Sequence, residues 1–427
     1  MTRLEGAKGR PVVYLHIGAM KTGTTYLQQL MYTNRDELRE AGVLLPGRSW
    51  GRQVRGVQDV MRLGRTDRFV RRQSRGVWEE LLAEVFASPE LTSVISVEFL
   101  SFAGRHGVRR VMDSLEGADV RVVLTVRDTA ATLPSQWQTL VHNSAKFSWP
   151  TYLEQIPEPV AQPLHVPRWP NSPTSQFHRT LNVPRMLTRW RAAMPTGALH
   201  VVTVPPRAGR PDELWRRFAE VVGVDPEAAR KPPEGTNPSL GYASTELVRQ
   251  VNKRIGRLPQ SEYNWTVKEI IALDVLVTRA QQEGRARLSR PAYDTAVAWN
   301  RLILDTIAST GAAVAGDLAD LPVEPDPAIR DDLPEVPASP SPGEMLEAAM
   351  LAADALRKLT KRRVHKLRRA GVEIEMPSLR SPEKLAADWA AAEDPVATAA
   401  GDLASAARDA AMMLRRLREE RRRAAGS

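Results

Sequence analysis

The sequence predicts an α/β protein with a parallel sheet flanked by helices and with a helical extension at its C-terminus. In the first half of the chain, short aliphatic runs alternate with longer segments of helical periodicity. This alternation is typical of a parallel sheet whose crossover helices cover both faces. Near the C-terminus the chain is rich in alanine, and only helical patterns remain. The predicted strands cover residues 11–17, 92–97, 120–126 and 198–204.

The segments between these strands are expected to be mostly helical, with two exceptions. Residues 48–75 hold many arginines and few aliphatic residues, which favours a loop with a short helix. Residues 157–174 hold six prolines, which favour an irregular loop. The predicted helices cover residues 24–40, 76–87, 107–116, 129–144, 183–194 and 211–223.

Composition divides the chain into three parts. Residues 11–320 form the predicted α/β domain, which ends in helices after residue 236. Residues 322–342 are rich in proline and acidic residues, as linkers often are. Residues 343–427 form a basic helical extension.

The extension is expected to hold two helices, over residues 343–371 and 382–424. In the second of them, Leu403, Ala410 and Leu417 recur every seventh residue. This spacing suits a short coiled coil or a helical hairpin. The C-terminal helices are therefore one route by which the chain could form a homo-oligomer.

The composition narrows the classes of partner and chemistry. The net charge of +10 and the pI of about 10.0 favour anionic partners, such as nucleotides, sulfates or an anionic surface. Arginine is also abundant in chains rich in alanine and proline for reasons of codon usage, so both explanations stay open. The absence of cysteine excludes disulfides, thiolate metal sites and a cysteine nucleophile. No apolar run reaches 18 residues, and no signal peptide is evident, so we expect a cytoplasmic protein without a membrane span.

A glycine- and threonine-bearing loop follows the first predicted strand. The segment HIGAMKTGTTYLQQ begins at His16 and leads from that strand into a helix. A turn of this kind directs backbone N–H groups and a helix N-terminus at one point, where an anion can bind. Lys21 adds a positive charge, and Thr24 and Thr25 add hydroxyl groups. In the Walker A motif the lysine follows the second glycine, whereas Lys21 precedes Gly23, which argues against ordinary ATP or GTP hydrolysis.

KTGTTY resembles the 5′-phosphosulfate loop of sulfotransferases that use 3′-phosphoadenosine 5′-phosphosulfate (PAPS). The resemblance implies a P-loop-like fold and a bound PAPS molecule as sulfuryl donor. It implies that the 5′ end of the donor contacts Gly18, Lys21, Thr22, Gly23, Thr24, Thr25 and Tyr26.

A second motif resembles the 3′-phosphate signature of the same family. Arg127 ends the strand VVLTV, and Ser135 follows eight residues later on the next predicted helix. In the family, these two residue types hold the 3′-phosphate. Asp128 departs from the usual asparagine, and the later Arg-Lys-Gly loop of the animal enzymes is not visible. The segments beginning at Val202 and Gly235 resemble predicted actinobacterial sulfotransferases, so the likeness covers about residues 11–320. Asn237 and Ser239 are expected to cap the following helix or, alternatively, to contact the donor.

Sulfuryl transfer requires a base that takes the acceptor proton and a cation near the leaving phosphate. Lys21 is the expected cation, and this chemistry requires no metal. Glu98, at the end of the strand TSVISV, is the first candidate for the base, and His106 is the second. His16 is expected to be structural, and Asp36 and Glu40 are remote alternatives.

The acceptor is expected to be a glycan, a glycolipid or a small metabolite. Its pocket is expected to involve residues 48–75, Trp137, His142 and the proline-rich loop with His165, Trp169 and His178. Two other functions stay open at this point: a P-loop nucleotide kinase, and a non-catalytic basic scaffold. No motif for specific nucleic-acid binding supports the scaffold beyond its charge.

Overall fold

The computed structural model describes residues 9–65, 68–164, 171–206, 210, 212–233, 239–377 and 380–426. Its contacts form two compact units, and each is described by itself. The sheet unit comprises residues 1–133, 155–237 and 291–331, and the helical unit comprises residues 134–154, 238–290 and 332–427. Among the described helices, none is long and apolar enough to cross a membrane. The division into domain, linker and extension that composition suggests stays a prediction.

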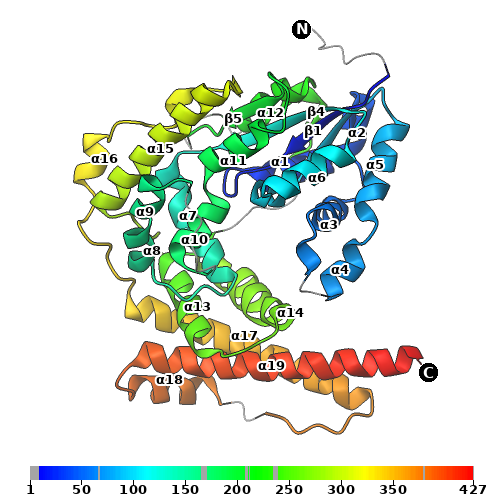
Figure 1. Cartoon of the computed structure of the whole chain (residues 1–427). Coiled ribbons are helices and arrows are strands. Elements are labelled where there is room, and N and C mark those ends of the chain that lie inside the picture. Colours follow the sequence, from blue (N-terminus) through cyan, green and yellow to red (C-terminus); the bar gives the residue numbers. More distant parts are fainter. Residues whose placement is uncertain are drawn as a thin grey trace. The chain divides into compact units, whose positions relative to one another are not determined.

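The sheet unit contains a six-stranded, all-parallel sheet with the strand order β2-β3-β1-β4-β5-β6 (Figure 1). The α/β class and the four predicted strands are therefore confirmed. The two edge strands were not predicted, because runs of two and three residues carry no readable pattern. The strands are β1 (Val12–His16), β2 (Val43–Leu44), β3 (Thr92–Ser96), β4 (Asp119–Val126), β5 (Leu199–Thr203) and β6 (Ala313–Ala315).

Apolar residues cover both faces of this sheet. On one face, Tyr14, Val94 and Val202 pack into a core with helices α1 (Thr24–Thr33) and α12 (Glu213–Val222). The alternate residues of the inner strands, among them Leu15, Ile95, Leu124 and Val201, are also fully buried. Burial on both faces explains why the strands read as continuous aliphatic runs rather than as alternating ones.

The predicted helix over residues 24–40 is two helices, α1 and α2 (Arg35–Glu40), which meet at Asn34. The fully buried Asn34 amide donates to Leu30 O at 2.9 Å and to Lys231 O at 2.8 Å. A side chain that bonds to the backbone in this way competes with helix continuation.

Residues 48–75, expected to be a loop with a short helix, contain more helix than that. This segment forms α3 (Trp50–Val60) and α4 (Arg68–Ser74). The buried contact of α3 is partly polar, since the fully buried Gln53 amide donates to Pro46 O at 3.1 Å and to Val94 O at 3.0 Å. A count of aliphatic residues therefore underestimated the amount of helix.

The described ends of the proline-rich segment are more helical than expected. Short helices α9 (Pro157–Ala161) and α10 (Pro173–Thr180) occupy its two ends, each with proline in its first turn. Proline is well accommodated there because those N–H groups have no intrahelical partner. Residues 165–170, with His165 and Trp169, lie outside the described residues. The other helices of the sheet unit are α5 (Val77–Ala87), α6 (Arg105–Ser114), α11 (Val183–Arg191), α15 (Arg290–Thr310) and α16 (Pro327–Asp331).

The helical unit contains the C-terminal helices. In it, α17 (Pro342–Arg369) and α19 (Pro395–Gly426) run side by side (Figure 1). The heptad positions Leu403 and Ala410 are buried, and Leu417 packs on a cluster that contains Met413 and Val364. The seam thus closes a hairpin within one chain. The other helices are α8 (Trp149–Gln155), α13 (Tyr242–Arg254), α14 (Gln260–Tyr263), a π-helix (Asn264–Val275), a 3₁₀-helix (Leu276–Arg279) and α18 (Pro382–Ala390), while α7 (Thr129–His142) runs from one unit into the other.

Replacement of Asn300 by alanine should destabilise the sheet unit. The fully buried Asn300 accepts from Thr129 N at 3.0 Å and Thr129 Oγ1 at 2.7 Å, and it donates to Asp128 Oδ1 at 2.9 Å. We expect Asn300→Ala to lower the free energy of unfolding by about 3 kcal/mol, because buried donors and acceptors lose their partner. Chemical denaturation measures this loss. Asn171→Ala, at an exposed position, is the control and should leave the free energy of unfolding unchanged. An equal loss of stability in both variants would contradict the structural role of Asn300.

Candidate functional site

The candidate site lies where three neighbouring strands end. β3, β1 and β4 are adjacent and parallel, so their carboxyl ends meet at one edge of the sheet. Glu98 follows β3, the loop with Lys21 follows β1, and Arg127 follows β4. The chain runs from β1 outward to β2 and β3, then crosses to β4 on the other side of β1. In such sheets this reversal point is where ligands bind.

The loop after β1 has a backbone that favours glycine. Gly18 has a φ of 100° and Gly23 a φ of 82°, and Lys21 also lies in the left-handed region at 65°. A Cβ atom on Gly23 would lie 2.4 Å from Leu214 Cδ2 of α12. Glycine is therefore required at residue 23 by conformation and by close packing.

Backbone hydrogen bonds fasten the loop to the neighbouring strand. Ala19 N donates to Thr125 O at 3.0 Å, and Thr125 N donates to Gly18 O at 2.6 Å. The Thr22 hydroxyl donates to Ala19 O at 2.6 Å and lies 2.5 Å from the Thr125 hydroxyl. The Thr22 side chain is buried and serves the loop itself, so the backbone of Thr22 is the part left to contact a ligand.

His16 is a structural histidine, as its position on the strand predicts. Its ring is fully buried, with Nδ1 2.8 Å from Ser96 Oγ and Nε2 3.3 Å from Thr125 Oγ1. Burial lowers the pKa of His16 to about 3. The imidazole is therefore neutral at physiological pH and links β3, β1 and β4 beneath the loop.

The start of α1 presents unpaired N–H groups to this edge. The helix begins at Thr24, and Gly23 provides no side-chain cap. Leu27 N donates to Gly23 O at 3.2 Å, while among the described residues no acceptor is found for the N–H groups of Thr24, Thr25 and Tyr26. Such groups carry the positive end of the helix dipole and suit an anion. The loop therefore has the backbone arrangement of an anion-binding turn, which the KTGTT motif predicts.

Arg127 and the loop line one small pocket in the sheet unit. Its wall includes Ala19, Met20 and Thr22 of the loop together with Arg127. Next to Arg127, the Asp128 carboxylate accepts from the backbone N–H groups of Ala130 at 3.1 Å and Ala131 at 3.2 Å. The unusual aspartate therefore caps α7, which is a role that sequence reasoning did not assign. Asn300, which orients Asp128, carries no sequence signal because it lies 172 residues away.

Ser135 lies on α7, as expected, two residues beyond the boundary of the sheet unit at Leu133. It belongs to the helical unit, and its pairing with Arg127 stays a prediction. The other expected members of the loop, from Gly18 to Tyr26, all belong to the sheet unit.

The Glu98 side chain lies against the loop. A Cβ atom on Gly18 would lie 3.1 Å from the Cβ atom of Glu98, and the Glu98 carboxylate accepts from Gln28 Nε2 at 3.0 Å. Gln28 of α1 also donates to Ser96 O at 3.1 Å and so fixes the end of β3. Sequence reasoning missed Gln28, although it follows Thr24 by four residues and thus shares its face of the helix.

The other candidate bases lie elsewhere. His106 is exposed on α6 and lines a pocket whose wall contains none of the residues from Gly18 to Tyr26. Asp36 and Glu40 are exposed on α2, and Glu40 lies three residues before β2 and therefore at the opposite edge of the sheet.

The structure places the expected acceptor-pocket residues in different units rather than around one described pocket. Trp137 is fully buried in the helical unit, with its ring centre 5.5 Å from that of Trp149, which leaves no surface for an acceptor. His178 is buried against Asn182 at 2.8 Å and lines a pocket of the sheet unit. His142 ends α7 in the helical unit. Asn237, which was expected to cap a helix or to contact the donor, lies outside the described residues.

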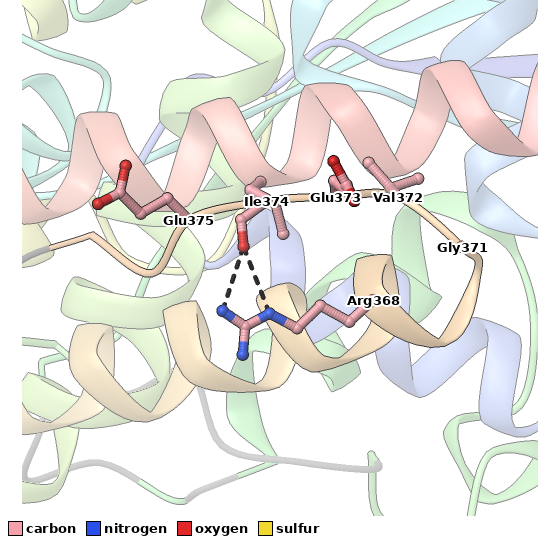
Figure 2. A pocket seen from close by; sticks show the side chains of 6 residues that line it. All are labelled: Arg368, Gly371, Val372, Glu373, Ile374 and Glu375. Atoms are coloured by element: carbon pink, nitrogen blue, oxygen red, sulfur yellow. Dashed lines mark hydrogen bonds between the residues drawn. The ribbon is translucent and has the colours of Figure 1, made fainter.

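A separate hollow lies on the helical unit, between the end of α17 and residues 371–375. Figure 2 shows that its arginine, Arg368, donates from two nitrogens to Ile374 O, at 3.3 and 3.1 Å. Its other charged residues are Glu373 and Glu375. With its one cation engaged by the backbone, this hollow has no chemistry comparable to that of the strand ends.

Comparison with known proteins finds no relative: no protein-family model, no curated protein and no solved structure matches the chain. Among the described residues, no group of three histidine, aspartate or glutamate side chains is placed to hold a metal ion.

The buried His16 should make the protein sensitive to acid. A neutral ring with a folded-state pKa of about 3 resists protonation, whereas the unfolded chain takes up that proton near pH 6.5. Stability should therefore fall as the pH drops from about 6.5 towards 3, by up to about 1.4 kcal/mol per pH unit. We expect His16→Gln to flatten this dependence in denaturation curves measured across that range. His106→Gln, at an exposed ring, should leave the slope unchanged, and identical slopes for His16→Gln and the parent would overturn the prediction.

Proposed function

We propose that this chain is a sulfotransferase that moves the sulfuryl group of PAPS to a hydroxyl or amine of an acceptor. The observation that carries the proposal is the convergence of the KTGTT loop, Glu98 and Arg127 at the ends of three adjacent strands. A cation, a carboxylate and an anion-binding loop at one edge are the groups that this transfer needs.

In this proposal the sheet unit holds the donor. The N–H groups at the start of α1 and the Lys21 ammonium bind the 5′-phosphosulfate. Arg127, on the wall shared with the loop, binds the 3′-phosphate, because a guanidinium grips a phosphate with two hydrogen bonds. The family resemblance also predicts the Ser135 hydroxyl as a donor to this phosphate.

Glu98 acts on the acceptor. Its carboxylate takes the proton of the acceptor hydroxyl while the acceptor oxygen forms a bond to sulfur. The bond from sulfur to the phosphate oxygen breaks at the same time, and 3′-phosphoadenosine 5′-phosphate (PAP) leaves with the electron pair. Lys21 stabilises the negative charge on that phosphate. Gln28 holds the Glu98 carboxylate at the loop through its 3.0 Å hydrogen bond.

Binding of PAP tests the donor side directly. Calorimetric titration should show that the protein binds PAP and prefers it to AMP, which lacks the 3′-phosphate. We expect Lys21→Gln to weaken PAP binding by about 10- to 100-fold, the effect of losing a charged hydrogen bond of about 1.5–3 kcal/mol. Arg127→Ala should remove the preference for PAP over AMP.

Lys253→Ala is the matched control, because Lys253 is exposed on α13 of the helical unit. It should bind PAP as the parent does. Magnesium-dependent ATP binding with no preference for a 3′-phosphate would replace the proposal by a nucleotide kinase.

Loss of the base should separate chemistry from donor binding. We expect Glu98→Gln to lower turnover by about 100-fold or more while PAP affinity is kept, because the amide still accepts from Gln28 but cannot take a proton. Transfer of label from [³⁵S]PAPS to a pool of acceptors from a cell extract measures turnover. Glu116→Gln, at an exposed site on the same unit, is the control. Full activity of Glu98→Gln together with an inactive His106→Gln would assign the base to His106 instead.

A further inference from the structure

The sheet unit has a groove lined by five arginines, which we call the arginine groove: Arg105, Arg109, Arg179, Arg185 and Arg189. Two adjoining pockets form it, of about 260 and 860 Å³, and both include Arg185 and Arg189 in their walls. The arginines come from α6 and from the consecutive helices α10 and α11, which lie about 60 residues or more further along the chain. Along the chain, α6 precedes β4 and α11 precedes β5.

The spacing of the arginines is regular. On α6, Arg105 and Arg109 are four residues apart, and on α11 so are Arg185 and Arg189. Residues four apart lie on one face of a helix and are separated by a rise of about 6 Å. Because both pairs line the same pocket, the two helices present matching rows of guanidinium groups.

No carboxylate among the described residues pairs with these charges. In the described part of the chain, none of the five forms an ion pair with a carboxylate, although Asp113 also lines the groove. Burial, together with the positive charges of Arg185 and Arg105, lowers the pKa of Arg189 to about 10. Burial also lowers the pKa of Arg185. Folding has thus brought like charges together at a cost, which an anionic ligand would offset.

Only part of the groove has a structural use. Arg189 Nη1 donates to Ala103 O at 3.2 Å, and the Arg179 guanidinium lies 4.8 Å from the centre of the Phe102 ring. For the side chains of Arg105, Arg109 and Arg185, no hydrogen-bond acceptor is found among the described residues. Packing alone therefore does not account for the cluster.

The groove begins beside the proposed base. Ser101 and Phe102 line it, and they belong to the same 3₁₀-helix as Glu98. The Ser101 hydroxyl donates to Glu98 O at 2.7 Å. A ligand that lies in the groove can thus place one end towards Glu98.

We propose that the arginine groove binds the anionic part of the acceptor, and that the acceptor carries at least two sulfate, phosphate or carboxylate groups about 6 Å apart. This inference rests on the proposed sulfotransferase function. It selects an anionic acceptor, such as a sulfated or carboxylated sugar chain or a compact polyphosphate, over a neutral metabolite.

Nucleic acid fits the groove less well. Proteins that bind single strands stack the bases on exposed aromatic rings, and the Phe102 face in the groove is covered by Arg179. Duplex DNA requires a wide basic surface with many phosphate contacts, whereas this groove is walled by two short helices.

Titrations of the full-length protein with three probes test the proposal. The probes are a heparin-derived hexasaccharide, inositol hexakisphosphate and a short deoxythymidine oligonucleotide. We expect the first or the second to bind, more weakly at high salt, and to lose at least about tenfold in affinity in Arg105→Ser/Arg185→Ser. The probe that binds more tightly shows whether the anionic groups of the natural ligand belong to a sugar chain or to a compact polyphosphate. This variant keeps the Arg189 contact with Ala103 and relieves repulsion, so its melting temperature should not fall.

Arg257→Ser/Arg285→Ser is the matched control, because it removes the same charge from exposed positions of the helical unit. It should bind the probe as the parent does. An equal loss in both double variants, or absence of binding by the parent, would overturn the proposal. Tighter binding of the oligonucleotide than of the other probes would also overturn it.

Binding of PAP separates this inference from the proposed function. Arg105→Ser/Arg185→Ser should bind PAP normally, and Lys21→Gln should bind the anionic probe normally. A protein that binds the probe through the groove but never binds PAP would keep the anion site and contradict the sulfotransferase. A protein that binds PAP but no anionic probe would keep the proposed sulfotransferase function and contradict the anion site in the groove.

Discussion

The candidate site depends on one junction, where the loop after β1 is hydrogen-bonded to β4. The two backbone bonds between Thr125 and the segment from Gly18 to Ala19 continue the ladder of the sheet beyond the last residue of β1. The loop can therefore turn back only after Ala19, and α1 begins at the sheet edge with its first N–H groups unpaired. The anion-binding shape follows from this constraint and does not require a ligand to form it.

The polar groups beneath the junction explain why it is rigid. His16, Ser96, Thr125 and Thr22 are all buried, and each hydroxyl or ring nitrogen has a partner within the group. A buried polar network that is fully paired favours a single arrangement, because any shift leaves a group unsatisfied. The same network sets the positions of β3, β1 and β4, from which Glu98, Lys21 and Arg127 emerge.

The sequence was informative where a pattern is local. The four longer strands and the loop at Lys21 could be predicted because aliphatic runs and glycine turns are determined by neighbouring residues. The extent of helix in residues 48–75 could not, because the buried contact of α3 is made partly by Gln53, whose partners lie on other segments. Asn300 and Gln28 were missed for a similar reason: an amide that bonds across the fold carries no signal in its own neighbourhood. The short strands β2 and β6 are defined only by the strands they pair with.

The arginines of this chain have different roles at different positions. Arg217 pairs with Glu213 and Asp320, and Arg415 in the helical unit pairs with Glu262 through two bonds. Such residues serve the fold, and their number can follow codon usage without a functional reason. The arginine groove differs because its arginines share the same pockets and, among the described residues, none of them forms an ion pair with a carboxylate. Random enrichment spreads charge over a surface, whereas two rows at matching helical spacing concentrate it. That concentration, rather than the net charge of +10, is the argument for an anionic partner.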